Sequence, residues 1–215
     1  MRAEDSRFAG YSEFVSTEAA LRAVLGTPPP RVTNKVQTRL DAICLDYIAR
    51  SPFCIIATAN ADGHIDVSPK GDPVGFAKVL SDTMLALPDR PGNRRADTFR
   101  NLLTNPRIGL MFIIPGKGEV LRVRGEARIV RDTALRETMA VNGKVPALAI
   151  VVAVEEAFVH CPKCMVRSGM WKPDMWPDLT GAADIGLAMS VHSKLPGTLE
   201  EQFAQAERDG LTKLY

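Results

Sequence analysis

The sequence predicts a mainly β fold with flanking helices, in which the strands form a small antiparallel barrel. From residue 53 onward, short apolar segments are separated by turns rich in Gly, Pro, Asn and Asp. One stretch of helical periodicity, from residue 93, crosses between them. Parallel strands need crossover connections of about a dozen residues or more, so this hairpin order favours an antiparallel barrel over a parallel sheet.

The predicted strands follow one another from residue 53 to residue 160. A hairpin turn at residues 60–63 joins the first two, residues 81–82 form another, and residues 115–118 a third. We expect six or so strands from the following segments: 53–59, 64–68, 76–80, 83–87, 107–114, 119–131 and 145–160.

Helices are predicted around these strands. Ser16 and Thr17 precede an apolar run that Gly26 ends, which is typical of a capped helix. The other helices are expected from an Asn34 cap to Ser51, from an Asn93 cap to Asn105, from Asp132, and at residues 196–215. We therefore divide the chain into an N-terminal helical extension packed on the barrel, residues 1–50, and a barrel domain with a C-terminal helical segment, residues 51–215.

Charge and hydropathy exclude several classes of protein. The 215 residues hold 27 Lys and Arg against 25 Asp and Glu, a net charge of +2, which argues against a nucleic-acid-binding protein. No run approaches the ~20 apolar residues that cross a bilayer, and the N-terminus lacks a secretory signal. The sequence thus predicts a cytoplasmic protein without a membrane segment. Four cysteines are too few for a disulfide framework.

The densest chemical signal is a basic loop before the crossing helix. Five arginines lie between residues 90 and 107: Arg90, Arg94, Arg95, Arg100 and Arg107. Three of them crowd a loop that contains Gly92 and opens a helix. Helix N-termini and arginine guanidinium groups both suit phosphate oxygens. The alternative is a solvated, charged helix start in which Asp89 and Asp97 neutralise their neighbours.

A second candidate lies where the second strand ends. Lys70 closes that strand beside Gly71, which lets another group approach the backbone. The alternative is an ordinary strand that ends in a turn. The lysine and the basic loop could converge on one phosphate, and the sequence leaves open whether they meet.

The remaining chemical motifs are incomplete. Cys161 and Cys164 resemble half of a zinc site or a redox pair, but a zinc site needs a second pair of ligands, so we expect no metal site. A nucleophile elbow, a dinucleotide fingerprint and a P-loop are all missing from the sequence. We therefore assign no catalytic residue.

Six motifs in order resemble the FMN-binding split-barrel proteins of the pyridoxamine 5′-phosphate oxidase-like superfamily. The resemblance spans about residues 14 to 176. Its motifs are 57–63 (ATANADG), 66–73 (DVSPKGDP), 88–95 (PDRPGNRR), 105–109 (NPRIG), 121–125 (LRVRG) and 160–163 (HCPK).

The resemblance implies a six-stranded antiparallel split β-barrel that forms a homodimer, with FMN bound at the subunit interface. The implied cofactor-binding residues are Ser68, Lys70, Arg90, Asn93, Arg94, Arg95, Arg167 and Trp171, the last two close to the partner subunit's flavin. Ile65 and Val120 depart from the pattern of the vitamin-converting oxidases. The resemblance therefore implies a flavin-binding branch of the superfamily and not the vitamin enzyme.

The expected function is that of an FMN-dependent oxidoreductase acting on a small substrate or a reduced nicotinamide. The flavin would carry the redox chemistry, and the protein would orient it. The alternatives are a flavin carrier or sensor without turnover, and a relative that binds haem or a deazaflavin.

Overall fold

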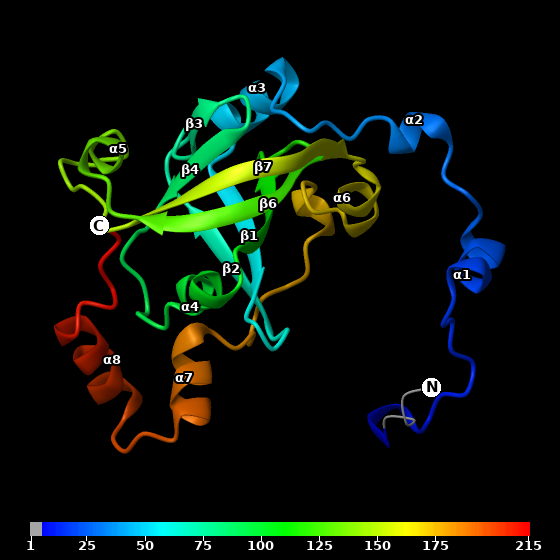
Figure 1. Ribbon diagram of the computed structural model, residues 1–215. Coiled ribbons are helices and arrows are strands. Elements are labelled where there is room, and N and C mark those ends of the chain that lie inside the picture. Colours follow the sequence, from blue (N-terminus) through cyan, green and yellow to red (C-terminus); the bar gives the residue numbers. More distant parts are fainter. Residues whose placement is uncertain (1–5) are drawn as a thin grey trace. The chain divides into compact units, whose positions relative to one another are not determined.

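The structure, a computed structural model, describes residues 6–215, and the chain divides into two units, residues 1–36 and 37–215 (Figure 1). The described part of the first unit holds η1 (Ser6–Phe8), α1 (Glu18–Leu25) and α2 (Pro30–Thr33). The side chain of Thr17 caps α1 and Gly26 ends it, which confirms the helix predicted there.

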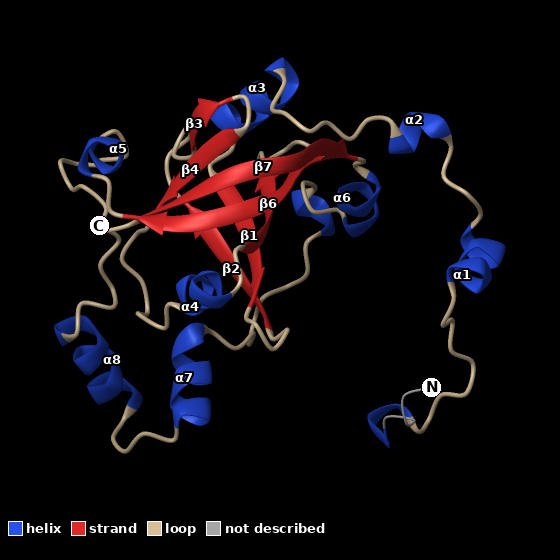
Figure 2. Ribbon diagram, in the orientation of Figure 1, coloured by secondary structure: helices blue, strands red, loops and turns tan. Residues whose placement is uncertain are grey.

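Seven antiparallel strands form one sheet in the order β2-β1-β5-β6-β7-β4-β3 (Figure 2). Each of the seven predicted segments forms a strand, so the expected count of six was wrong by one, and β3 is a strand of only four residues. The bounds are β1 Phe53–Ala59, β2 Ile65–Gly71, β3 Lys78–Ser81, β4 Met84–Pro88, β5 Arg107–Ile113, β6 Val120–Val130 and β7 Ala149–His160.

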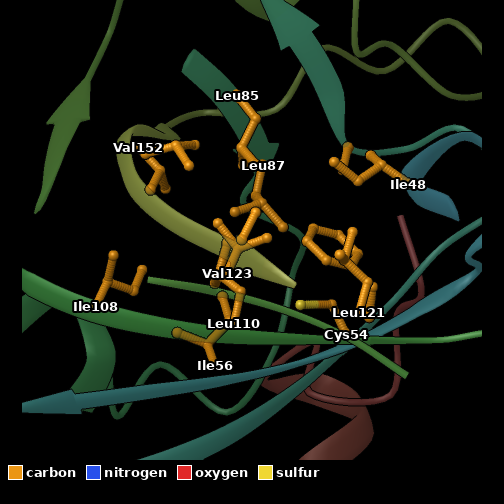
Figure 3. Close-up of a cluster of buried hydrophobic side chains, with 14 of the residues drawn as sticks. Ile48, Cys54, Ile56, Leu85, Leu87, Ile108, Leu110, Leu121, Val123 and Val152 are labelled. Carbon is orange, nitrogen blue, oxygen red and sulfur yellow. The ribbon is translucent and has the colours of Figure 1, made fainter. Parts of the chain in front are cut away.

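One face of the sheet forms the core. Along β1 every second residue is buried, and Ile56 lies opposite Leu110 of β5. Leu87 of β4 and Val123 of β6 belong to the same cluster of buried side chains, and Figure 3 shows them converging with Leu110. Burying a Leu, Ile or Val side chain contributes about 1.5–3 kcal/mol, so this cluster is the main source of stability of the sheet.

Helix α3 (Ala42–Arg50) covers one end of the core. Its residues Cys44, Tyr47 and Ile48 are buried, and the helix contacts β6 and β7. The predicted start was wrong, because the Asp41 side chain caps α3 and Asn34 instead ends α2. The second unit begins at Gln37, so α3 belongs to the unit that holds the sheet and not to an extension of residues 1–50.

Helix α4 (Asp97–Thr104) packs against β1, β2 and β6 (Figure 1). It starts at Asp97, and its N-cap position is taken by Ala96, whose backbone is left-handed with φ +56°. The expected Asn93 cap was therefore wrong. The Asn93 side chain accepts instead from the backbone N–H of Arg95, 3.0 Å away, and so closes a turn before the helix.

Five further helices follow β6. They are α5 (Thr133–Glu137), α6 (Lys163–Ser168), η2 (Pro173–Met175), α7 (Ile185–Ser193) and α8 (Leu199–Arg208). The Asp132 side chain caps α5 as predicted, and α8 lies within the predicted helical tail. Helices α6 and α7 were not predicted. Within residues 6–215, every helix is too short or too polar to cross a membrane.

Candidate phosphate-binding site

The ends of β2 and β4 meet, although the two strands are not neighbours in the sheet. Arg90, two residues after β4, donates from Nε to Oδ2 of Asp72, the residue after β2, at 2.6 Å. The same guanidinium donates to the backbone oxygen of Met139 at 2.8 Å. The side chain of Asp72 is 1% exposed and that of Arg90 16%. This buried ion pair fixes the basic loop beside the strand that carries Lys70.

The half-buried face of β2 points toward α4 and the basic loop. Asp66, Ser68 and Lys70 alternate along the strand and therefore share this face. Asp66 accepts from the hydroxyl of Thr98 in α4 at 2.9 Å. Ser68 and Lys70 thus lie on the side from which the basic loop approaches.

Lys70 has fewer partners than Arg90, Arg94 or Arg95, the arginines of the basic loop. Within residues 6–215 its ammonium forms neither a hydrogen bond nor an ion pair. Burial raises the pKa of the nearby Asp89 carboxyl, and the positive charges of Lys70 and Arg90 oppose that rise. The positive charge of Lys70 is therefore only partly balanced.

The loop between β4 and α4 holds two non-glycine residues in left-handed conformations. Arg94 has φ +60° and Ala96 φ +56°. Each such conformation costs about 1–3 kcal/mol and is concentrated at functional sites. Arg95, between them, donates from Nε to Oδ2 of Asp97 at 2.7 Å, as the charge-neutralised alternative had suggested. Arg94 donates from Nη2 to the backbone oxygen of Asp209 at 2.9 Å.

Arg95 also lines a polar hollow beside α4, about 520 Å³ in volume. Asp66 of β2 and Asn101 of α4 lie in the same wall. The basic loop thus runs along β2: Arg90 pairs with Asp72 just after the end of the strand, and Arg95 shares the hollow with Asp66 near its start.

Arg167 lies in α6 and Trp171 follows that helix, so both come after the last strand, β7. The first residue of β7, Ala149, pairs with Pro88 beside the basic loop, whereas α6 follows the last residue, His160. The indole N–H of Trp171 donates to the backbone oxygen of Lys117 at 2.8 Å. Within residues 6–215, neither Arg167 nor Trp171 forms a hydrogen bond or an ion pair with Lys70.

The outer face of β2, β1 and β5 is apolar, which our sequence analysis missed. Ile65 and Val67 are 75% and 62% exposed, and Ile55 lies opposite Met111 beside them. A hollow of about 880 Å³ opens on this face. Its polar rim includes Arg122, Arg124, Glu155 and Glu156. The signal was present in residues 53–59, where both faces of the strand are apolar.

The cysteines fall into two classes. Burial raises the pKa of the Cys44 thiol to about 11 and that of Cys54 to about 12. Cys161 and Cys164 are exposed and are not joined by a disulfide. Among residues 6–215, no three His, Cys, Asp or Glu side chains are grouped so that they could hold a metal ion.

The fold, together with Lys70 and the basic loop, defines a mainly β protein with a candidate anion site. The model of the pyridoxamine 5′-phosphate oxidase family matches residues 40–161, more than half of the chain. The chain therefore belongs to that family, which confirms the resemblance found in the sequence. A search of curated proteins finds no match.

Several solved structures are similar to the chain at low sequence identity. A variant of HupZ from Group A Streptococcus is 22% identical, with 56% of this chain and 99% of that chain covered and a TM-score of 0.46. A candidate pyridoxamine 5′-phosphate oxidase from Lactobacillus delbrueckii is 19% identical, with 57% and 95% covered and a TM-score of 0.45. HutZ, the haem storage protein of Vibrio cholerae, is 18% identical, with 57% and 94% covered and a TM-score of 0.40.

Proposed function

We propose that the protein binds FMN and that Ser68, Lys70, Arg94 and Arg95 hold its phosphate. The observation that carries the proposal is Lys70. Lys70 is a half-buried residue whose positive charge acts on the Asp89 carboxyl next to Arg90, and within residues 6–215 its ammonium has no hydrogen-bond or ion-pair partner. An ammonium without a partner of its own can donate to the oxygens of a bound anion.

The donor set fits a phosphate group. Lysine offers three N–H donors and arginine five, and Arg94 uses only one of its own, on the backbone oxygen of Asp209. Ser68 adds a hydroxyl on the same face of β2. Arg90, which is committed to Asp72, positions the loop in this proposal, and Asn93 shapes its turn.

We further propose a homodimer that buries the apolar outer face of β2, β1 and β5. Exposed apolar patches of this kind mark interaction surfaces, and outward-facing residues of an antiparallel sheet are usually polar. In such a dimer Arg167 and Trp171 would serve the partner's flavin, as the family resemblance implies. The complete cofactor site would then need both copies.

A bound flavin would supply the redox chemistry, so the function we propose is that of an FMN-dependent oxidoreductase with a small substrate or a reduced nicotinamide as electron donor. The chain's residues would bind the phosphate and orient the ring. A flavin carrier or sensor without turnover uses the same binding residues and differs only in the absence of reduction.

The absorbance spectrum of the purified protein tests the cofactor. A flavin gives two bands in the near-ultraviolet and blue, and their loss on addition of a reduced nicotinamide would support an oxidoreductase. Flavin bands that persist with every donor tried would favour the carrier. A haem or deazaflavin spectrum would contradict the FMN proposal.

Replacement of the two loop arginines tests the phosphate site. In Arg94→Ala/Arg95→Ala we expect the Kd for FMN to rise about 100-fold, because charge-assisted hydrogen bonds to phosphate are lost. Riboflavin, which has no phosphate, should bind both proteins equally. The matched control, Arg39→Ala/Arg50→Ala, removes two exposed arginines that pair with Asp82 and Asp46. Unchanged FMN affinity in the first variant would contradict the site.

A further inference from the structure

Residues 209–215, which follow α8, lie on the basic loop, and we refer to them as the strap. At its start the backbone oxygen of Asp209 accepts from Nη2 of Arg94 at 2.9 Å. At its end the hydroxyl of Tyr215 donates to Oδ1 of Asp72 at 2.7 Å. Lys144 donates to the backbone oxygen of Tyr215 at 2.9 Å. The strap therefore contacts both the loop and the carboxylate that anchors it.

Tyr215 covers the buried ion pair. The guanidinium carbon of Arg90 lies 5.7 Å from the centre of the Tyr215 ring, within the range of a cation–π contact. The two oxygens of Asp72 are divided between Arg90 Nε and the Tyr215 hydroxyl. A ligand that approaches Arg90 from the side of this ring must first displace Tyr215.

The strap is held by polar contacts and little apolar burial. Leu211 is 39% exposed and Leu214 80% exposed. Helix α8 contains no buried residue, and its Phe203 packs on Gly186 of α7 rather than on the sheet core. A segment with so few buried contacts opens at low free-energy cost. The strap can therefore leave the loop without unfolding the sheet.

We propose that the strap is an autoinhibitory contact over the phosphate site, which a phosphate-bearing ligand must displace in order to bind. This inference rests on the proposed function. In the closed form the strap engages Arg94, a residue of the proposed site, and Tyr215 covers the ion pair that positions the loop, so only the open fraction of molecules offers the complete site. The apparent Kd then equals the intrinsic Kd divided by that open fraction.

Two variants test the strap, one that loses only the hydroxyl of Tyr215 and one that lacks residues 209–215. In Tyr215→Phe we expect FMN to bind about tenfold more tightly and to associate faster, because a hydrogen bond to a charged acceptor no longer holds the closed form. The truncated chain should bind at least as tightly. The matched control is Tyr11→Phe, an exposed tyrosine in the other unit. Riboflavin binding should not change in any variant.

A second readout follows the strap itself. Hydrogen exchange of the amides of residues 209–215 should accelerate when FMN or inorganic phosphate is added to the full chain, and riboflavin should have no such effect. If FMN accelerates the exchange and inorganic phosphate does not, displacement of the strap requires the whole cofactor. If FMN and inorganic phosphate both accelerate it, the phosphate group is sufficient.

The outcomes separate the two proposals. Equal FMN affinity in all chains, with unchanged exchange in the strap, overturns autoinhibition and leaves FMN binding intact. Weaker FMN binding in Tyr215→Phe overturns it too, because the strap would then be part of the site. If none of the chains binds FMN, the proposed function is contradicted, and the strap proposal falls with it.

Discussion

Asp72 links the parts of the candidate site at the scale of single residues. Its side chain is 1% exposed, and each of its oxygens accepts one hydrogen bond, from Arg90 and from Tyr215. A carboxylate removed from water is costly unless its partners compensate for the lost hydration. Arg90 is therefore a positioning residue, whose first effect is on folding and on the place of the basic loop.

Replacement of Arg90 tests this role. In Arg90→Met we expect the free energy of unfolding to fall by about 3 kcal/mol, because Asp72 remains buried without its cation. Urea denaturation measures the loss. The double variant Arg90→Met/Asp72→Asn should recover part of it, since no buried charge is left. The control Arg50→Met breaks the exposed pair with Asp46 and should cost about 0.5 kcal/mol. A loss equal to that of the control would contradict the role.

The cations of the site could be predicted from the sequence, but their partners could not. Lys70 and the loop arginines stand out because their residue types and the neighbouring glycines suit an anion. Asp97 was foreseen as a neutralising neighbour, and it does pair with Arg95. The partner of Arg90 is Asp72, eighteen positions away in the chain. That pairing depends on how the ends of β2 and β4 meet, which local patterns do not encode.

At the scale of secondary-structure elements, the pairing of β6 with β7 requires a residue without a side chain at Gly125. The register between β6 and β7 shifts between Arg124 and Gly125. A Cβ at Gly125 would lie 1.9 Å from the backbone oxygen of Ala153, which no real contact permits. The bulge thus brings the two backbones so close that only glycine fits.

We expect Gly125→Ala to lower the free energy of unfolding by about 3 kcal/mol, because the backbone of β7 must move to accept the methyl group. The control is Gly109→Ala in β5, where a Cβ would lie 3.9 Å from the Cβ of Ala57, an ordinary contact. It should cost less than about 1 kcal/mol. Equal losses in the two variants, measured by denaturant unfolding, would contradict this explanation of the bulge.

Strands were more predictable than helix boundaries. The strand segments are short apolar runs between clear turns, and all of them form strands, including β3. The Asn34 and Asn93 caps were wrong because an Asn side chain can as readily end a helix or close a turn. Helix α7 was missed because its own apolar residues lie on all of its sides, and Leu187 and Val191 are among those that are exposed. The helix therefore has no amphipathic stripe.

At the scale of the whole molecule, the outer face of the sheet is apolar where β2, β1 and β5 lie together. The inner face packs into the core, whereas Ile55, Val67 and Met111 on the outer face have no covering layer among the described residues of the second unit. In a single copy this apolar patch is exposed to water, which is unfavourable. A second copy of the chain would cover it, and would also carry Arg167 and Trp171 toward the partner's flavin.

A charge at the centre of this face should separate the two copies. We expect wild-type protein to elute as a dimer and Met111→Glu as a monomer in size-exclusion chromatography with light scattering, because a buried interface would have to desolvate an unpaired carboxylate. The FMN affinity of the monomer should fall, since Arg167 and Trp171 of the partner are lost from the site. The control Ile43→Glu places the same charge on an exposed residue of α3. Circular dichroism should show the same fold in all three proteins. The wild-type protein can also be diluted until it is a monomer. If that monomer binds FMN as tightly as the dimer does, a site shared between two copies is contradicted.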